Sequence, residues 1–259
     1  MSVIRADGVE KSYGSVDALT GLSVDVSRGE LFGFLGPNGA GKTTTIGILT
    51  GQVAPDAGRV EVLGTDPTAD PIETRRRVGI LPEQESPPSF LTPREYFEFV
   101  GNVRDLDPEL VAERVDVWAD RLGFRAKLDT LHTDLSRGQQ QKVMITQAFL
   151  HEPEVVFIDE PLANLDPLVQ EQVKRFLVSY AAADNAVFVS THNIDVAEDI
   201  CTRVGIVADG AVVAERAVGD GTEGLLDVFL ERVDDADARD LPSGGVAAAD
   251  GGTSAEPKP

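Results

Sequence analysis

The feature that most constrains the fold of this chain is a glycine-rich stretch that ends in lysine and threonine. Residues 36–43 read Gly-Pro-Asn-Gly-Ala-Gly-Lys-Thr, which fits the pattern G-x-x-x-x-G-K-[ST]. In this pattern backbone N–H groups surround phosphates, the lysine reaches the terminal phosphates and the hydroxyl group ligates magnesium. Residues 29–36 suit a strand and residues 43–49 suit a helix. Strand, glycine turn and helix in this order predict a nucleotide phosphate-binding loop that uses Lys42 and Thr43.

Two carboxylates follow a short apolar run further along the chain. Residues 155–158 are all apolar and suit a buried parallel strand, and Asp159 and Glu160 come directly after them. Asp159 is suited to hold magnesium, directly or through water, and Glu160 is suited to polarise an attacking water as a general base. Because acids are common in this chain, the prediction depends on the motif that precedes them.

That motif is Leu-Ser-Arg-Gly-Gln at residues 135–139. Ser136 and Gln139 have the spacing of a capping box, so they predict a helix start, where free N–H groups and the helix dipole favour an anion. The stretch resembles the signature of the ATP-binding cassette (ABC) family, and the phosphate loop, signature and carboxylate pair follow the order seen in that family. The resemblance covers about residues 1–232.

The resemblance implies an α/β fold, a P-loop NTPase cassette with a mainly parallel core sheet, an N-terminal antiparallel β subdomain and an inserted helical subdomain. Residues from about 85 to 151 suit the helical subdomain, because N-cap and proline signals open helices there. Residues 233–259 are rich in Asp, Ala, Gly, Ser and Pro and are predicted to form a disordered acidic tail. Short apolar runs predict further strands at residues 3–6, 22–26, 59–63, 78–81, 186–190, 204–208 and 211–215.

The resemblance also implies ATP as the nucleotide and Mg²⁺ as its metal ion. His192, which follows Ser190 and Thr191, resembles the family's switch histidine, which contacts the γ-phosphate and positions the catalytic water; with Glu160 it forms the implied catalytic pair. Tyr13 resembles the aromatic residue that stacks on adenine, although stacking accepts every base and an exposed loop tyrosine is the alternative. The implied nucleotide-binding residues are Tyr13, Gly36, Pro37, Asn38, Gly39, Ala40, Gly41, Lys42, Thr43, Thr44, Ser136, Gly138 and Gln139.

One position departs from the family pattern beside the expected metal site. The family usually has glutamine just after the strand at 78–81, whereas this chain has Glu83 followed by Gln84. Either residue can occupy the position. We expect Glu83 to be a metal ligand beside Thr43 and Asp159, because a carboxylate ligates magnesium as an amide does, at a greater cost when the ion is absent.

The charge balance restricts the partners of the chain. It has 23 Lys and Arg against 44 Asp and Glu, a formal net charge of −21. This acidity disfavours nucleic acid and anionic lipid surfaces as partners, because phosphate binding needs a positive surface. The composition resembles that of proteins from halophilic archaea, in which molar salt screens self-repulsion; an ordinary acidic mesophilic protein is the alternative.

Single residues and apolar runs give three further expectations. Cys201 is the only cysteine, which excludes an intrachain disulfide, and we expect it to be a small buried hydrophobe. His132 and His151 are expected to be solvated. No export signal and no apolar run of roughly 20 residues is found, so we expect a cytoplasmic chain without direct lipid insertion.

The family pattern implies a function that involves two cassettes. ATP would lie between the phosphate loop of one chain and Ser136, Gly138 and Gln139 of a second, identical chain, with Arg137 adding positive charge. The implied activity is ATP hydrolysis that drives a separate transmembrane permease, with the chain peripheral on the inner face of the cell membrane. The Gly-Ile-Leu-Pro-Glu stretch at 79–83 and the helix around 225–230 favour multidrug or sodium export systems.

Two alternatives are weighed against the transporter. A soluble ABC-type ATPase, such as an iron–sulfur cluster assembly component, remains open. A generic P-loop kinase is disfavoured by the signature. The transported substrate, its direction and the identity of the second cassette are left open by the sequence.

Overall fold

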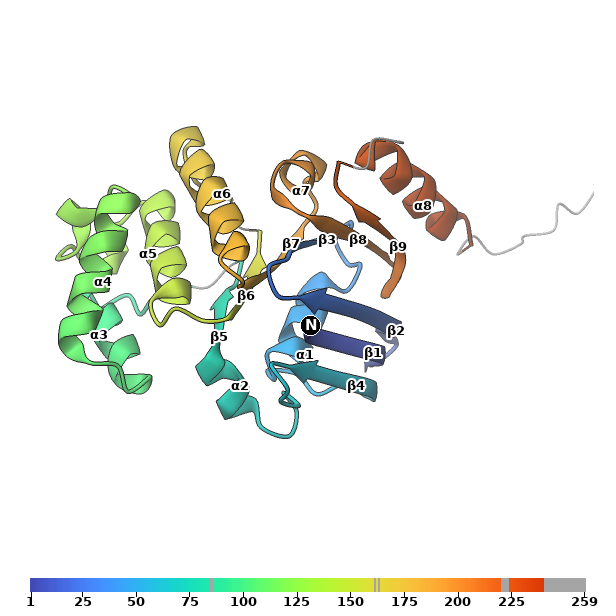
Figure 1. Cartoon of the computed structure of the whole chain (residues 1–259), viewed down its shortest axis with the longest axis horizontal. Helices are drawn as coiled ribbons and strands as arrows, with labels where there is room; N and C mark the ends of the chain where they lie inside the picture. The colour runs from blue at the N-terminus through green and yellow to red at the C-terminus, as the bar shows by residue number, and fades with distance from the viewer. Residues whose placement is uncertain (84–85, 161, 163, 220–223, 240–259) are drawn as a thin grey trace, which may run out of the picture.

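The computed structural model describes residues 1–83, 86–160, 162, 164–219 and 224–239. Its larger sheet has six strands and is mainly parallel, as predicted, with only the last pair antiparallel (Figure 1). In spatial order the strands are β5 (Val78–Leu81), β6 (Val155–Asp159), β7 (Ala186–Thr191), β3 (Leu31–Leu35), β8 (Arg203–Ala208) and β9 (Ala211–Ala217).

A second, antiparallel sheet comes from the N-terminal part of the chain, as the fold prediction required. Its strands, in the order β2-β1-β4, are β1 (Ser2–Tyr13), β2 (Val16–Ser27) and β4 (Ala57–Val62). Helix α1 (Lys42–Leu49) contacts strands of both sheets and lies between them (Figure 1). The helix that follows the phosphate loop is therefore held on two sides.

The central strands of the parallel sheet are buried on both faces. Every residue of β6 and β7 is buried, which explains why their sequences are continuous apolar runs. On the face toward the antiparallel sheet, the ring of Phe188 has its centroid within 5.2–5.8 Å of those of Phe32, Phe34 and Phe157. These packed rings fix the positions of β3, β6 and β7 relative to one another, and with them the ends of these strands.

Helices follow in the region where the sequence predicted a helical subdomain, and they lie at one end of the molecule (Figure 1). Thr92 and Glu95 form the predicted capping box of α3 (Pro93–Val103). Asp107 caps α4 (Pro108–Arg121) by accepting from two backbone N–H groups. The remaining elements here are the short 3-10 turns η1 (Arg125–Lys127) and η2 (His132–Asp134), and α5 (Arg137–Phe149).

The other helices cover the parallel sheet and its edges. α6 (Pro167–Ala182) contacts β7, and α7 (Ile194–Ile200) contacts β3 and β7. α2 (Pro71–Arg77) and α7 were not predicted, although Asp70 and Asn193 cap them. Among the described residues, no helix is long and apolar enough to cross a membrane.

The last helix differs from the tail prediction. α8 (Leu225–Arg239) continues past residue 232, where the disordered tail was expected to begin. The start of the helix is attached to the protein, since Leu225 and Val228 are buried against the core. The rest of the predicted tail, 240–259, lies outside the described residues.

The expectation that His132 and His151 are solvated is wrong. His132 is only 4% exposed, and neither of its ring nitrogens has a hydrogen-bond partner among the described residues. The Nε2 atom of His151 lies 3.1 Å from the carbonyl oxygen of Val78. Burial lowers the pKa of His132 and, with help from two nearby arginines, lowers the pKa of His151 to about 4. Both rings are packed as neutral groups.

Cys201 is buried, as expected, and burial raises the pKa of its thiol to about 12. It packs in the core beside Gly33 of β3, where an added Cβ would lie 2.8 Å from the sulfur atom. The thiol therefore acts as a small apolar side chain.

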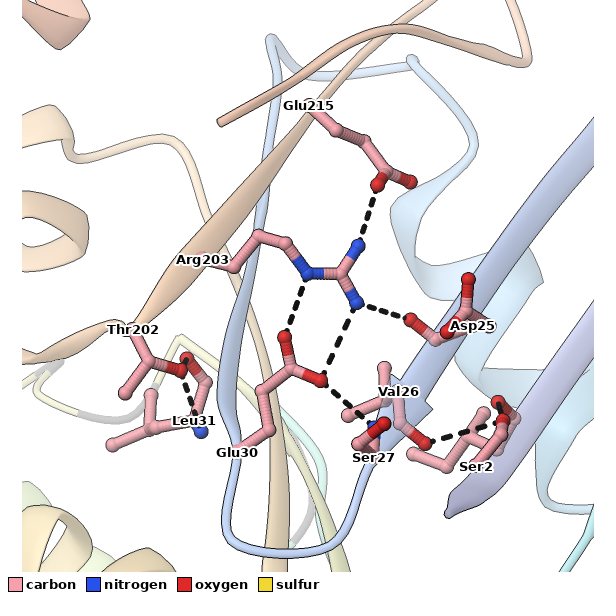
Figure 2. A network of polar contacts seen from close by, with 10 residues as sticks. Ser2, Asp25, Val26, Ser27, Glu30, Leu31, Thr202, Arg203 and Glu215 are labelled. Carbon is pink, nitrogen blue, oxygen red and sulfur yellow. Dashed lines mark hydrogen bonds and ion pairs between the residues drawn. The ribbon is translucent and has the colours of Figure 1, made fainter. Parts of the chain in front are cut away.

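Arg203 joins the two sheets (Figure 2). Its Nε donates to Oε1 of Glu30 at 2.7 Å, and its Nη2 donates to the carbonyl oxygen of Asp25 at 2.6 Å. Nη1 pairs with Glu215 on β9. The guanidinium also lies over the ring of Phe32, 4.7 Å from its centroid. The end of β2, the start of β3 and the β8–β9 pair are thus held by one side chain.

Candidate functional site

An open cavity of about 260 Å³ lies where several strands of the parallel sheet end. Ligands of α/β sheets commonly bind outside these carboxyl ends. The cavity is lined by residues of the phosphate loop, by residues that follow three strands and by two residues of the antiparallel sheet: Asn38, Gly39, Gly41, Lys42, Thr43, Thr44, Glu83, Asp159, Glu160, His192, Val16 and Ala18. The structure therefore brings most of the predicted site residues together.

The loop between β3 and α1 needs its glycines. Gly41 has φ 97°, and a Cβ at this position would lie 2.6 Å from the carbonyl oxygen of Ala18. A Cβ on Gly36 would lie 2.4 Å from the carbonyl oxygen of Val207. A larger residue cannot occupy either position without moving backbone. Gly36, Pro37 and Ala40 do not line the cavity; they shape the turn, with Ala40 N–H donating to the Pro37 carbonyl oxygen at 3.3 Å.

Lys42 is folded back over the loop. Its Nζ donates to the carbonyl oxygens of Gly36 and Pro37 at 2.7 and 2.9 Å, and the residue is 8% exposed. Burial lowers the pKa of Lys42, and the carboxylates of Glu160, Asp159 and Glu83 oppose that shift. The ammonium group lies at the start of α1, where free N–H groups also favour an anion.

Thr43 and Asp159 form the part of the site that suits a metal ion. Thr43 Oγ1 donates to Oδ2 of Asp159 at 3.0 Å, while Ser190 Oγ donates to the other carboxylate oxygen. Asp159 is 5% exposed. A hydroxyl and a carboxylate oxygen are ligands that Mg²⁺ prefers, so the residues fit this ion. Among the described residues no group of three His, Cys, Asp or Glu side chains that could hold a metal ion is found.

Glu160 is held by the residues that follow β7. Its Oε1 accepts from the backbone N–H of His192 at 3.0 Å and lies 2.6 Å from His192 Nδ1, and its Oε2 accepts from Thr191 Oγ1 at 3.1 Å. The Glu160 backbone is left-handed, with φ 52°, and its N–H donates to the carbonyl oxygen of Ser190. These contacts fix a carboxylate at the cavity wall, with the His192 ring more exposed beside it.

The structure places Glu83 in the cavity wall, after the end of β5. Gln84, the other candidate for this position, lies outside the described residues. Glu83 thus faces the same space as Asp159 and Lys42, and its role as a metal ligand stays a prediction.

The signature residues do not line this cavity. Ser136 and Gln139 form the predicted capping box of α5, with Ser136 N–H donating to Gln139 Oε1 at 3.0 Å. Gly138 packs against the loop that follows β6, because an added Cβ would lie 2.8 Å from the carbonyl oxygen of Asn164. Within one chain, the signature and the phosphate loop remain apart.

Tyr13 also lies outside the cavity lining. It is half exposed at the end of β1, and Lys11 Nζ lies 5.5 Å from the centroid of its ring. Its role in stacking on a base remains a prediction.

Two residues that line the cavity were not predicted from the sequence. Val16 and Ala18 at the start of β2 line the cavity beside the phosphate loop. They come from the other sheet, and an apolar residue in a strand carries no signal for a ligand. Ser190 and Thr191, quoted only as neighbours of His192, orient the two carboxylates; hydroxyls at the end of an apolar strand were the available signal.

Comparison with known proteins identifies the family. A family model described as ABC transporter matches residues 19–163. The chain is 36% identical to an uncharacterized ABC transporter ATP-binding protein from Synechocystis sp., over 79% of this chain and 58% of that protein. It is 33% identical to a daunorubicin resistance ATP-binding protein from Streptomyces coeruleorubidus, over 83% of this chain and 68% of that protein. It is also 33% identical to a lipopolysaccharide export system ATP-binding protein from Haemophilus influenzae, over 83% of this chain and 90% of that protein.

Solved structures agree. The chain resembles an ATP-binding subunit of an ABC transporter with a TM-score of 0.83 and 27% identity, over 90% of this chain and 99% of that one. A dimeric bacterial ABC transporter cassette gives a TM-score of 0.77 at 25% identity, over 83% of this chain and 98% of that one. The P-loop cassette fold predicted from the sequence is confirmed. The chain therefore belongs to the ABC transporter family, whose ATP-binding cassettes hydrolyse ATP with Mg²⁺.

Proposed function

We propose that this chain is the ATP-hydrolysing subunit of an ABC transporter, that two copies close around ATP, and that the pair drives export through a separate membrane permease. The observation that carries the proposal is the convergence of two pairs, Thr43 with Asp159 and Glu160 with His192, on one cavity beside the phosphate loop. Phosphate binding, metal binding and water activation need these groups side by side.

Each group has a stated task in this proposal. The glycine loop and Lys42 bind the phosphates, and Thr43 and Asp159 would hold Mg²⁺, which offsets phosphate charge. Glu160 accepts a proton from the water whose oxygen attacks the γ-phosphorus, while the bond to the β–γ bridging oxygen breaks and leaves ADP. His192 fixes the Glu160 carboxylate, and its own ring stays exposed at the cavity wall, where it would contact the γ-phosphate.

Two copies are proposed because the signature lies away from the cavity. Ser136, Gly138 and Gln139 stand at the start of α5, where a helix N-terminus favours an anion. A second chain can bring these residues over the phosphate loop of the first. The solved cassette that is dimeric supports this arrangement.

Export is proposed from the relatives. One is named for daunorubicin resistance, one for lipopolysaccharide export and one, from Paraburkholderia xenovorans, for Nod factor export. The chain would then lie on the inner face of the membrane, attached through the permease.

Co-purification tests the transport part of the proposal. The tagged chain is recovered from native membranes, gently solubilised in high salt, and the proteins that accompany it stoichiometrically are identified by mass spectrometry. A membrane protein with several spans supports the transporter. Only soluble companions, with ATP hydrolysis intact, would overturn it in favour of a soluble ABC-type ATPase.

A further inference from the structure

We propose that Glu83 makes this site selective for ATP that arrives with its metal ion, because its carboxylate repels the metal-free nucleotide. The inference rests on the proposed function in one respect, that ATP binds in the cavity beside Lys42. It assigns to Glu83 a task that a glutamine at the same place could not perform.

The cavity has an excess of negative charge. Three carboxylates line it, those of Glu83, Asp159 and Glu160, against the single ammonium group of Lys42. These three carboxylates are also the ones whose charge acts on Lys42. Metal-free ATP is a polyanion, so the three carboxylates oppose the attraction that Lys42 and the free N–H groups of the loop exert on its terminal phosphates.

Glu83 differs from the other two carboxylates in how it is held. Asp159 accepts hydrogen bonds from Thr43 and Ser190, and Glu160 accepts them from Thr191 and the backbone of His192. Within the described part of the chain, no hydrogen bond or ion pair joins the Glu83 carboxylate to another residue. The side chain is exposed, so water screens part of its charge. Without a local partner, the Glu83 carboxylate is free to turn toward or away from an incoming charge.

A divalent ion reverses the sign of this interaction. With the ion on the β- and γ-phosphates, the carboxylate faces a positive charge and attracts it. Among the described residues no group of three His, Cys, Asp or Glu side chains is placed to hold a metal ion, so we expect the ion to enter with the phosphates. A glutamine would be neutral toward both forms and would discriminate less between them.

Nucleotide binding without turnover tests this inference. The dissociation constants of ATP are measured by calorimetry for the full chain, once with excess MgCl₂ and once with EDTA. We expect Glu83→Gln to bind metal-free ATP about two- to fivefold more tightly than the unaltered chain, the effect of removing one exposed charge beside a polyanion. Binding of ATP with MgCl₂ should not tighten.

Three controls make the result specific. Glu113→Gln removes the same charge from the exposed face of α4 and should leave both constants unchanged. Glu83→Asp keeps the charge and should keep the discrimination. The effect of Glu83→Gln should shrink for ADP and vanish for AMP, and it should weaken as KCl is raised.

The possible outcomes separate the two proposals. If the unaltered chain fails to bind ATP with MgCl₂, the proposed function is overturned. If it binds, and Glu83→Gln leaves the metal-free affinity unchanged or shifts both constants equally, the inference about Glu83 alone is wrong. Melting curves without nucleotide confirm that each variant is folded.

Discussion

The Nδ1 atom of His192 lies 2.6 Å from Oε1 of Glu160, at the wall of the cavity that the phosphate loop borders. The same oxygen accepts from the His192 backbone N–H at 3.0 Å. Backbone and ring of one residue thus hold the general base that we propose, and the histidine orients a carboxylate whose other oxygen is bound by Thr191.

Glu160→Gln should bind ATP with MgCl₂ but hydrolyse it about 10²- to 10⁴-fold more slowly, because an amide cannot accept the proton of the attacking water. ATP that is not hydrolysed should then hold two chains together, and size-exclusion chromatography in ATP should show a dimer. Glu113→Gln on exposed α4 is the matched control. A Glu160→Gln chain that stays monomeric in saturating ATP, at a KCl concentration where it is folded, contradicts the shared site.

His192→Ala should reduce hydrolysis by roughly 10- to 100-fold, less than the loss of Glu160, because the carboxylate remains and only its orientation is loosened. ATP affinity should change little, since Lys42 and the glycine loop are untouched. Steady-state ATPase assays and nucleotide titrations separate the two effects. Full hydrolysis in the His192→Ala chain would remove the histidine from the proposed mechanism.

His151 should make the fold sensitive to mild acid. Its pKa is lowered to about 4 in the folded chain, from an ordinary value of about 6.5. The unfolded chain therefore takes up a proton that the folded chain refuses between these pH values. The part of the free energy of unfolding that depends on a neutral His151 is fully present above pH 6.5, declines as the pH falls toward 4, and is lost below that value.

Urea unfolding of the unaltered chain and of His151→Gln measures this effect. Between pH 7 and pH 5 the unaltered chain should lose about 2 kcal/mol more than the variant, by the linkage of one proton. Glutamine keeps an N–H donor for the Val78 carbonyl oxygen, which His151 Nε2 faces in the structure. Equal losses in both chains would show that His151 titrates normally when folded.

Phe188→Ala should lower the free energy of unfolding by about 3–5 kcal/mol, because it leaves a cavity among the rings of Phe32, Phe34 and Phe157. Phe90→Ala is the control. Phe90 is 75% exposed, so its loss should change stability by no more than about 0.5 kcal/mol. Denaturant titration of both variants checks the contrast, and similar costs at both positions would contradict the placement of Phe188.

Potassium chloride should stabilise the chain. The formal net charge is −21, and raising the salt from about 0.1 to 1 M shortens the screening length from about 10 to 3 Å. We expect the melting temperature to rise steadily over this range and the chain to loosen at low salt. A melting temperature that does not depend on KCl would favour the ordinary acidic mesophilic protein.

The parts of the fold that the sequence predicted well are those with strong local signals. The apolar runs of β6 and β7 and the caps at Thr92 and Asp107 each act over a few residues. β1 and β2 are longer than the predicted 3–6 and 22–26, because register shifts interrupt the alternation that marks a strand. α2 and α7 are too short for a helical period to appear.

The site residues that could be predicted are likewise those with strong local signals. Lys42, Thr43, Asp159 and Glu160 belong to motifs whose chemistry fixes their spacing, so the sequence could predict them. The burial of His132 and the partial burial of His151 depend on what the rest of the chain packs around them, and a single histidine carries no such information.

Arg203 has a consequence for how nucleotide and fold are linked. Through Glu30 and Asp25 it attaches the end of β2 to the parallel sheet, while the start of β2 supplies Val16 and Ala18 to the cavity. A bound nucleotide would therefore add a further contact between the same two sheets, near the start of the same strand. Near the start of β2, Thr20 already donates to the carbonyl oxygens of Asp209 and Gly210 in the turn between β8 and β9. Binding and release of the nucleotide would therefore change how firmly this strand is held against the parallel sheet, while the protein's own contacts keep it in place.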